Sequence, residues 1–599
     1  MVWARRVWPP GVSVKPQSRP RKISPRKLAQ KVLLIGWDAA DWKVITPLLD
    51  AGQMPALESV INQGVMGNLA TLRPILSPLL WNSIATGKRP DKHGILDFFE
   101  PDPHYGGIRP VTSTSRKVKA IWNILTQRGF KSHVVGWFAG HPAEPINGVA
   151  ISPLYPLPKF ATPDPWPLAE NSVHPPSLAQ TFAELRIHPA ELSAEEILPF
   201  VPRAAEVNQK EDHAIEQLAK VIAETCTIHN AATWILENQE WDFLAIFYNA
   251  IDHFCHRFMQ YYPPAPKAIP EQEAEIYKDV VPSAYRFQDL LLRRMLAFAG
   301  PDTAVIILSD HGFHSDHLRP RLTPNEPAGP TIWHRPIGII SMCGPGIRQD
   351  ERIYGANLLD ITPTILTLFG LPVGQDMDGR VITQAFEETP QIEVIPSWED
   401  EPGESGMHPE DQRMDAEAAK AMIEQFVALG YLNPPPEGKA RVVDVVIREQ
   451  KFNLARVYLD KWQFVDALPL LEELNEQWPE ELRFALELSR CYLELGRRDD
   501  AADVLAEEVK HGKPGWADWL MGVNYSERGD DQMAMEHLLR AEKANPRLPD
   551  LHLRIGDVYR RMRRWEDARR SYRRALKLDA DSAGSYLGLA MVALAQKRN

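Results

Sequence analysis

The chain has 599 residues, a formal net charge of −12 and a hydrophobic content of 44%. Its length allows several globular domains, and its acidic balance argues against specific binding of nucleic acid. No run of about 18 apolar residues is present, so the sequence predicts no membrane span. The four cysteines form no CxxC pair, which argues against a disulfide framework or a thiolate zinc site. We therefore predict a cytoplasmic protein.

Residues 1–30 form an arm that is rich in arginine, lysine and proline and contains no acidic residue. This composition predicts disorder. The arm lacks the apolar segment of a secretory signal. It is either a contact for an anionic surface or an over-extended start of the reading frame that is not part of the native protein.

Apolar strands alternate with helical segments over residues 31–386, which we predict to be one domain. Strands are expected at 31–37, 132–137, 243–248, 304–309 and 337–342, and helices at 118–128, 204–238, 282–299 and 360–369. This alternation predicts an α/β fold with a mostly parallel sheet between layers of helices. The proline-rich stretch 153–202 is expected to be an insertion over one edge of the sheet.

Residues 387–446 are predicted to be an acidic linker followed by a connecting helix at 415–429, and residues 447–599 contain an internal repeat. Tyr458, Tyr492, Tyr525 and Tyr559 are 34, 33 and 34 residues apart, and each is followed nine residues later by an alanine. This period predicts helix pairs stacked into a solenoid. The pattern resembles the tetratricopeptide repeat, with four units and part of a fifth. The resemblance implies a concave surface that binds a protein or peptide partner.

Side chains that bind metals follow three of the predicted strands. Asp38 follows the first strand, Asp252 and His256 follow the strand at 243–248, and Asp310 and His311 follow the strand at 304–309. The carboxyl ends of parallel strands meet at one edge of a sheet, so we predict one shared metal centre. Taken singly, His256 is better explained as a core histidine, and residues 309–312 are equally well explained as a polar loop.

Ser77 and Pro78 stand at the start of a predicted helix. The pair is typical of an N-cap serine with proline at the first helical position, and this explanation is sufficient by itself. The functional alternative uses the same geometry. A helix N-terminus favours an alkoxide and a bound phosphate, and a nearby cation would make the hydroxyl a nucleophile.

Taken in order, these motifs resemble the alkaline phosphatase superfamily, most closely its type I phosphodiesterase and nucleotide pyrophosphatase branch. The resemblance covers about residues 31–385 and includes the segments 77–95 and 360–380. It implies two divalent ions, for which mixed carboxylate and imidazole ligands favour zinc, with manganese as the alternative. One ion would be held by Asp252, His256 and His334. The other would be held by Asp38, Asp310 and His311, with Ser77 on or near it.

The resemblance implies a metal-dependent phosphoesterase that hydrolyses phosphodiesters or pyrophosphates through a phosphoserine at Ser77. The alternatives are an inactive domain that serves as a scaffold for the repeats, and phosphomonoester or phosphonate hydrolysis at the same site. Nucleotide pyrophosphatases carry threonine in place of Ser77, and an asparagine where this chain has Phe98; Asn82 or Asn249 could supply the missing donor. The sulfatase signature is absent, because Leu79 and Trp81 replace its proline and arginine.

Overall fold

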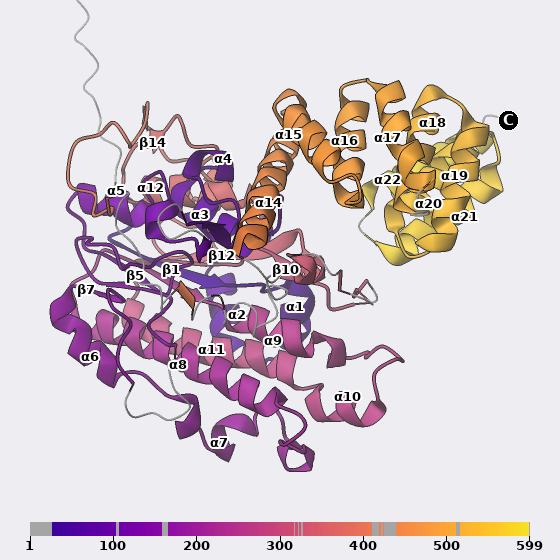
Figure 1. Ribbon diagram of the computed structural model, residues 1–599. Coiled ribbons are helices and arrows are strands. Elements are labelled where there is room, and N and C mark those ends of the chain that lie inside the picture. The colour runs from indigo at the N-terminus through magenta and orange to yellow at the C-terminus, as the bar shows by residue number, and fades with distance from the viewer. Residues whose placement is uncertain are drawn as a thin grey trace, which may run out of the picture.

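The computed structural model describes residues 27–102, 107–157, 166–316, 318–320, 323–324, 327–409, 419–420, 423, 439–510, 515–580 and 582–597. Residues 1–26 of the predicted arm lie outside the described residues, as does most of the helix predicted at 415–429. The described part consists of an α/β domain and a helical solenoid that begins at α14 (Figure 1). No helix in this part is both long and apolar enough to cross a membrane.

The α/β domain is built on a nine-stranded sheet in the order β13-β2-β12-β9-β1-β8-β5-β6-β7. Its strands are β1 (Lys31–Trp37), β2 (Gly64–Ala70), β5 (Ser132–Val135), β6 (Ala150–Ile151), β7 (Val173–His174), β8 (Phe243–Tyr248), β9 (Thr303–Leu308), β12 (Ile337–Cys343) and β13 (Glu351–Asn357). The central strand β1 runs parallel to both β8 and β9. The sheet is mostly parallel, as predicted, but β12 is antiparallel to β9 and β2, and β7 is antiparallel to β6. The carboxyl ends of β1, β8 and β9 therefore lie together at one edge.

Helices cover both faces of this sheet (Figure 1). One layer contains α1 (Trp42–Asp50), α2 (Pro55–Asn62), α8 (Ala214–Asn238), α9 (Ala250–Phe258), α10 (Glu271–Tyr277) and α11 (Val280–Ala299); the other contains α3 (Ser77–Thr86), α4 (Pro90–His93), α5 (Ile121–Gln127) and α12 (Ile361–Leu368). Successive side chains of β1 point to opposite faces, so Val32 and Leu34 pack in one hydrophobic core, and Leu33 and Ile35 in the other. Burial on both faces explains why this strand is a continuous apolar run.

Shorter elements complete the domain. They include the hairpin of β3 (Phe99–Pro101) and β4 (Ile108–Pro110), the hairpin of β10 (Gly312–Phe313) and β11 (His334–Arg335), the pair β14 (Val373–Gly374) and β15 (Val394–Ile395), and α6 (Ala179–Glu184) and α7 (Ala194–Ile197) in the proline-rich stretch. Residues 387–409, where the linker was predicted to begin, pack against the α/β domain: β15 pairs with β14, and Trp398 is fully buried.

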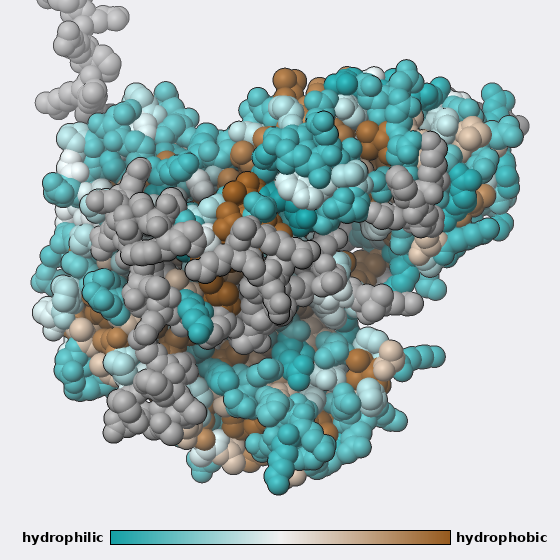
Figure 2. Space-filling model, viewed as in Figure 1, coloured by the Kyte–Doolittle hydropathy of each residue, from teal (hydrophilic) through white to brown (hydrophobic). Residues whose placement is uncertain are grey.

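The solenoid consists of α14 (Lys439–Asp460), α15 (Phe464–Gln477), α16 (Leu482–Glu494), α17 (Arg498–Lys510), α18 (Trp516–Arg528), α19 (Asp531–Ala544), α20 (Pro549–Arg561), α21 (Trp565–Leu578) and α22 (Ala583–Lys597). The repeated alanines at 467, 501, 534 and 568 are all fully buried. A Cβ at Gly522 would lie 2.6 Å from the side chain of Leu538, and one at Gly556 would lie 2.6 Å from that of Tyr572. The repeat thus keeps small residues where paired helices make their closest approach. Figure 2 shows a mostly hydrophilic surface on the visible face of both parts.

The first helix of the solenoid contacts the segment that follows α3 and α4. From α14, Asn453 Nδ2 donates to the Leu96 carbonyl at 3.0 Å, and Gln450 Nε2 donates to the Phe99 carbonyl at 2.9 Å. Two ion pairs flank these bonds, Arg89 with Asp460 at 2.5 Å and Lys461 with Asp91 at 2.6 Å. The solenoid is therefore anchored beside the helix that carries Ser77.

Candidate metal centre

Six of the predicted ligands lie together in two groups of three; five of them follow the three central strands, and His334 lies in β11. The histidine cluster is Asp252, His256 and His334, and the carboxylate cluster is Asp38, Asp310 and His311; within each, one ligand atom per residue lies within 4.8 Å of the others. Asp38 follows β1, Asp252 lies in the first turn of α9 after β8, and Asp310 follows β9. This is the shared strand-end edge that the sequence predicted.

In the histidine cluster, two ring nitrogens face each other beside a carboxylate. His256 Nε2 lies 3.0 Å from His334 Nε2, and these atoms lie 3.4 and 3.6 Å from Asp252 Oδ1. Burial lowers the pKa of His256, and burial together with the neighbouring imidazoles holds the pKa of His334 well below its ordinary value. Both rings are therefore neutral near pH 7 and present lone pairs to a cation.

In the carboxylate cluster, His311 Nε2 lies 3.4 Å from Asp38 Oδ1 and 3.6 Å from Asp310 Oδ2. His311 Nδ1 lies 3.0 Å from the Gly312 carbonyl. A carbonyl only accepts, so Nδ1 carries the proton and Nε2 presents its lone pair to the carboxylates. Burial and the charges of Asp310 and Asp252 raise the pKa of Asp38 well above its ordinary value, and burial also raises the pKa of Asp310.

The two clusters are adjacent, because the rings of His311 and His334 are stacked with centroids 3.8 Å apart. Within the described residues, several of their buried atoms have no hydrogen-bond partner: both carboxylate oxygens of Asp38 and of Asp252, Asp310 Oδ2 and His311 Nε2. Buried polar atoms are nearly always paired, and unpaired ones are costly. The donor set therefore fits two cations, one in each cluster.

Ser77 is the first residue of α3, and the predicted N-cap position was wrong by one residue. The N-cap is Leu76, whose backbone is extended, and Pro78 occupies the second helical position. Ser77 Oγ makes no capping bond; it is fully buried and has no hydrogen-bond partner in the described part of the chain. The hydroxyl is therefore free for chemistry at a helix N-terminus, where partial positive charge favours an anion.

One residue that supports the site was not identified from the sequence. Asp41 caps α1 by accepting from Lys43 N at 2.8 Å, and it also accepts from Phe313 N at 3.1 Å and from Arg335 Nη1 at 2.6 Å. Phe313 and Arg335 belong to β10 and β11, so Asp41 anchors the hairpin that carries His334. The position before α1 marks Asp41 as a cap in the sequence, but its partner Arg335 is 294 residues away.

Two glycines allow this hairpin to approach the strand ends. A Cβ at Gly312 would lie 2.4 Å from Asp41 Oδ2, and a Cβ at Gly338 would lie 2.1 Å from the Ser309 carbonyl oxygen. Neither position has room for a side chain without moving the backbone that sets His311 and His334.

The segment after α3 has a structural role at His93. His93 Nδ1 accepts from Ile95 N at 3.2 Å, so Nε2 carries the proton and donates to Ser83 Oγ at 3.0 Å. Burial lowers the pKa of His93 to about 3. Of the two suggested replacements for the missing asparagine, Asn82 donates its amide to the Pro78 carbonyl at 2.8 Å inside α3, and Asn249 is the N-cap of α9.

Comparisons with known proteins find similarities for both parts of the chain. Residues 32–318 match the family model of type I phosphodiesterase / nucleotide pyrophosphatase, and residues 454–510 and 553–599 match tetratricopeptide repeat models. Among solved structures, a putative sulfatase from Bacteroides thetaiotaomicron is 14% identical and covers 60% of this chain and 74% of its own, with a TM-score of 0.38. A thermophilic tetratricopeptide repeat protein from Thermus thermophilus is 20% identical and covers 30% of this chain and 90% of its own, with a TM-score of 0.23. A search of curated proteins gave no match.

Proposed function

We propose, because residues 32–318 match the family model of type I phosphodiesterase / nucleotide pyrophosphatase, that the chain is a metal-dependent phosphoesterase that hydrolyses phosphodiesters or pyrophosphates through a phosphoserine at Ser77. The observations that carry the proposal are the buried group of six candidate ligands and an unpartnered serine hydroxyl at a helix N-terminus. Zinc is the preferred ion, and manganese is the alternative. The cytoplasmic location remains a prediction from the sequence.

The protein groups divide the chemistry between them. When bound, two divalent ions would supply positive charge that stabilises the phosphoryl oxygens in the transition state and lowers the pKa of a nearby hydroxyl. Ser77 Oγ would attack phosphorus, the bond from phosphorus to the ester oxygen would break, and the proton lost by Ser77 would end, through solvent, on the leaving oxygen to give the free alcohol. Water would then attack the phosphoserine, releasing the phosphoryl product and restoring the Ser77 hydroxyl. The N-terminus of α3 favours the negative charge that develops beside it.

The solenoid supports a second part of the proposal. Tetratricopeptide repeats are stacked helix pairs that present a concave surface, and we propose that this surface binds a protein or peptide partner. The contacts of α14 with the segment after α4 would hold such a partner at a fixed position relative to the catalytic domain.

The test compares zinc- or manganese-supported hydrolysis of bis-p-nitrophenyl phosphate and p-nitrophenyl phosphate. We expect faster cleavage of the diester, loss of activity with a chelator, and loss of activity in Ser77→Ala. Ser83→Ala is the matched control, since Ser83 lies on the same helix but is bonded to His93. Faster cleavage of the monoester would favour a phosphomonoesterase. Binding of two ions without cleavage of either ester would favour the scaffold alternative.

A further inference from the structure

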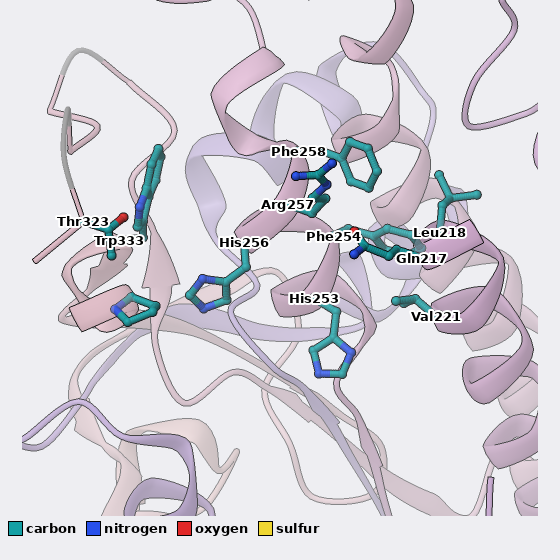
Figure 3. A pocket seen from close by; sticks show the side chains of 11 residues that line it. Gln217, Leu218, Val221, His253, Phe254, His256, Arg257, Phe258, Thr323 and Trp333 are labelled. Carbon is teal, nitrogen blue, oxygen red and sulfur yellow. The ribbon is translucent and has the colours of Figure 1, made fainter. Parts of the chain in front are cut away.

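A cavity of about 260 Å³ lies directly against the histidine cluster. Figure 3 shows His256 between Trp333 on one side and the side chains of α8 and α9 on the other. The ring of His256 belongs to both sites: its Nε2 lies 3.0 Å from His334 Nε2, and the ring also lines the cavity. A group attached to a phosphate at the histidine cluster is therefore next to this cavity.

The cavity has aromatic walls that are held in place by further rings. Phe254 and Phe258 come from α9, and Trp333 comes from the turn just before His334. The Phe254 ring stacks on Phe200 at 5.4 Å and 27°, and the Trp333 ring stacks on Phe313 at 5.8 Å and 27°. Fixed ring faces bind planar groups well, because offset-stacked and edge-to-face contacts add to the burial of apolar area.

Polar side chains share the rest of the lining with Leu218, Val221 and Pro330. Gln217 and Arg257 offer donors, and Arg257 Nη2 is 3.7 Å from Asp212 Oδ1 at a half-exposed position. A planar group with a hydrogen-bond acceptor on its edge matches this mixture of ring faces and donors.

The size of the cavity restricts its occupant. Sites for drug-sized ligands have volumes of roughly 300–1,000 Å³, and this cavity is smaller. It has space for one ring system and too little for a long acyl chain. We propose that it binds an aryl or heteroaryl group esterified to the scissile phosphate, so that aromatic phosphodiesters are the substrate class. This inference rests on the proposed function and names the substrate of the same site.

A binding experiment tests the cavity without turnover. Phenylphosphonate, butylphosphonate and methylphosphonate are titrated into the zinc-loaded full chain by calorimetry. We expect phenylphosphonate to bind at least about tenfold more tightly than the other two, since its ring would fill the cavity. Equal affinity for phenylphosphonate and methylphosphonate overturns the proposal. Equal affinity for phenylphosphonate and butylphosphonate overturns the aromatic class.

Amino-acid substitutions test whether the preference for phenylphosphonate arises in this cavity. Val221 lines the cavity from α8, and Val221→Trp fills it; the matched control is Lys220→Trp at the adjacent, exposed position. The preference for phenylphosphonate should disappear in Val221→Trp and persist in Lys220→Trp. Should Val221→Trp fail to fold, Trp333→Ala removes one wall and should reduce the preference about tenfold. A preference that survives loss of the wall overturns the proposal.

Turnover separates this inference from the proposed function. Bis-p-nitrophenyl phosphate and methyl p-nitrophenyl phosphate share a leaving group and differ in the second ester. We expect a kcat/KM about tenfold higher for the first, and loss of this difference in Val221→Trp. Cleavage of both at an equal kcat/KM that Val221→Trp leaves unchanged rejects the cavity and keeps the phosphodiesterase. If neither diester is cleaved, the phosphodiesterase proposal is rejected. Phosphonate binding alone then tests whether the cavity binds an aromatic group.

Discussion

The two ligand clusters have the same number of residues but differ in charge and in surroundings. The carboxylate cluster carries two carboxylates and one imidazole, all fully buried, whereas the histidine cluster carries one carboxylate and two imidazoles, and His256 also lines the cavity. With neutral imidazoles, a divalent ion would be fully neutralised in the first cluster and would keep one positive charge in the second. Residual charge beside an open cavity attracts a phosphate. We therefore expect the carboxylate cluster to position Ser77 and the histidine cluster to bind substrate.

The clusters also differ in mechanical support. The carboxylate cluster stands at the ends of β1 and β9, neighbouring strands in the middle of the sheet. The histidine cluster is assembled from α9 and the short β10–β11 hairpin, which depends on the contact between Asp41 and Arg335. Changes outside the sheet should therefore affect the histidine cluster first.

The largest expected effect comes from neutralising one carboxylate. Asp310→Asn keeps the shape of the side chain and halves the negative charge of its cluster. We expect kcat/KM to fall by about 10³-fold or more, with loss of one of two zinc equivalents, since the ion and the charge that it supplies would both be lost. Metal content by mass spectrometry after dialysis, together with diester hydrolysis, checks this.

His256→Asn is the matched change in the other cluster, and it should weaken the second ion while the first stays bound. Loss of both ions in both variants would contradict the assignment of separate sites.

The second largest expected effect is a difference between the two clusters in the protons that they release when zinc binds. The pKa values of Asp38 and Asp310 are raised, so over a pH range just above the ordinary pKa of aspartate the ion-free cluster holds protons that an ordinary aspartate would have lost. An ion that binds the carboxylate cluster must displace these protons. The affinity of the cluster for zinc should therefore fall, as the pH is lowered, by up to about tenfold per pH unit for each proton displaced. The lowered pKa values of His256 and His334 leave no proton to displace near pH 7. Zinc calorimetry in two buffers of different ionisation enthalpy measures the protons released.

The matched experiment uses Asp310→Asn, in which zinc binds only to the histidine cluster. The heat of zinc binding to this variant should be the same in both buffers, whereas the heat of zinc binding to the unaltered chain should differ between the buffers. Buffer-independent heats in both would contradict the difference between the clusters.

Supporting contacts should have the next largest effect. Arg335→Gln removes the charge that pairs with Asp41 and should loosen the hairpin that holds His334. We expect a loss of about 10–100-fold in zinc affinity at the histidine cluster, the usual range for residues that support a ligand from outside. Arg352→Gln, at an exposed position of β13, is the control and should have no effect. An equal loss at the carboxylate cluster would show that the hairpin supports both.

The difference between ligands and their support also explains what the sequence could predict. The meeting of Asp38, Asp252 and Asp310 at one edge was predictable because each follows an apolar run, and parallel strands bring such ends together. The repeats were predictable because their period is local. The contact between Asp41 and Arg335, the antiparallel direction of β12, and the packing of residues 387–409 were not. These features depend on which segments meet in space, and no spacing in the sequence records that.

The start of α3 shows the same limit on a smaller scale. Serine before proline predicts an N-cap from local preference, but Leu76 takes that position and leaves the Ser77 hydroxyl unbonded. A shift of one residue in the start of the helix therefore separates a capping serine from a buried serine hydroxyl without a bond.

The smallest expected effect lies at the junction of the solenoid with the α/β domain. Burial raises the pKa of Asp97 to about 7, and its Oδ2 lies 3.4 Å from Asn453 Nδ2 of α14. Between about pH 4 and pH 7 the folded chain holds a proton here that the unfolded chain has lost, so this group's contribution to stability falls as the pH rises and is constant above 7. Asp97→Asn does not titrate and should stabilise the junction at pH 8 by about 1–2 kcal/mol. The gain should vanish near pH 4.

Thermal unfolding at pH 5 and pH 8 checks this, with Asp91→Asn as the control. Asp91 pairs with Lys461 at 2.6 Å across the same junction, so its loss should lower the Tm at both pH values. A lower Tm for Asp97→Asn at pH 8 would mean that the ionised carboxylate holds the solenoid in place. Burial would then be outweighed by the bond from Phe98 N, which donates to Asp97 Oδ1 at 2.7 Å.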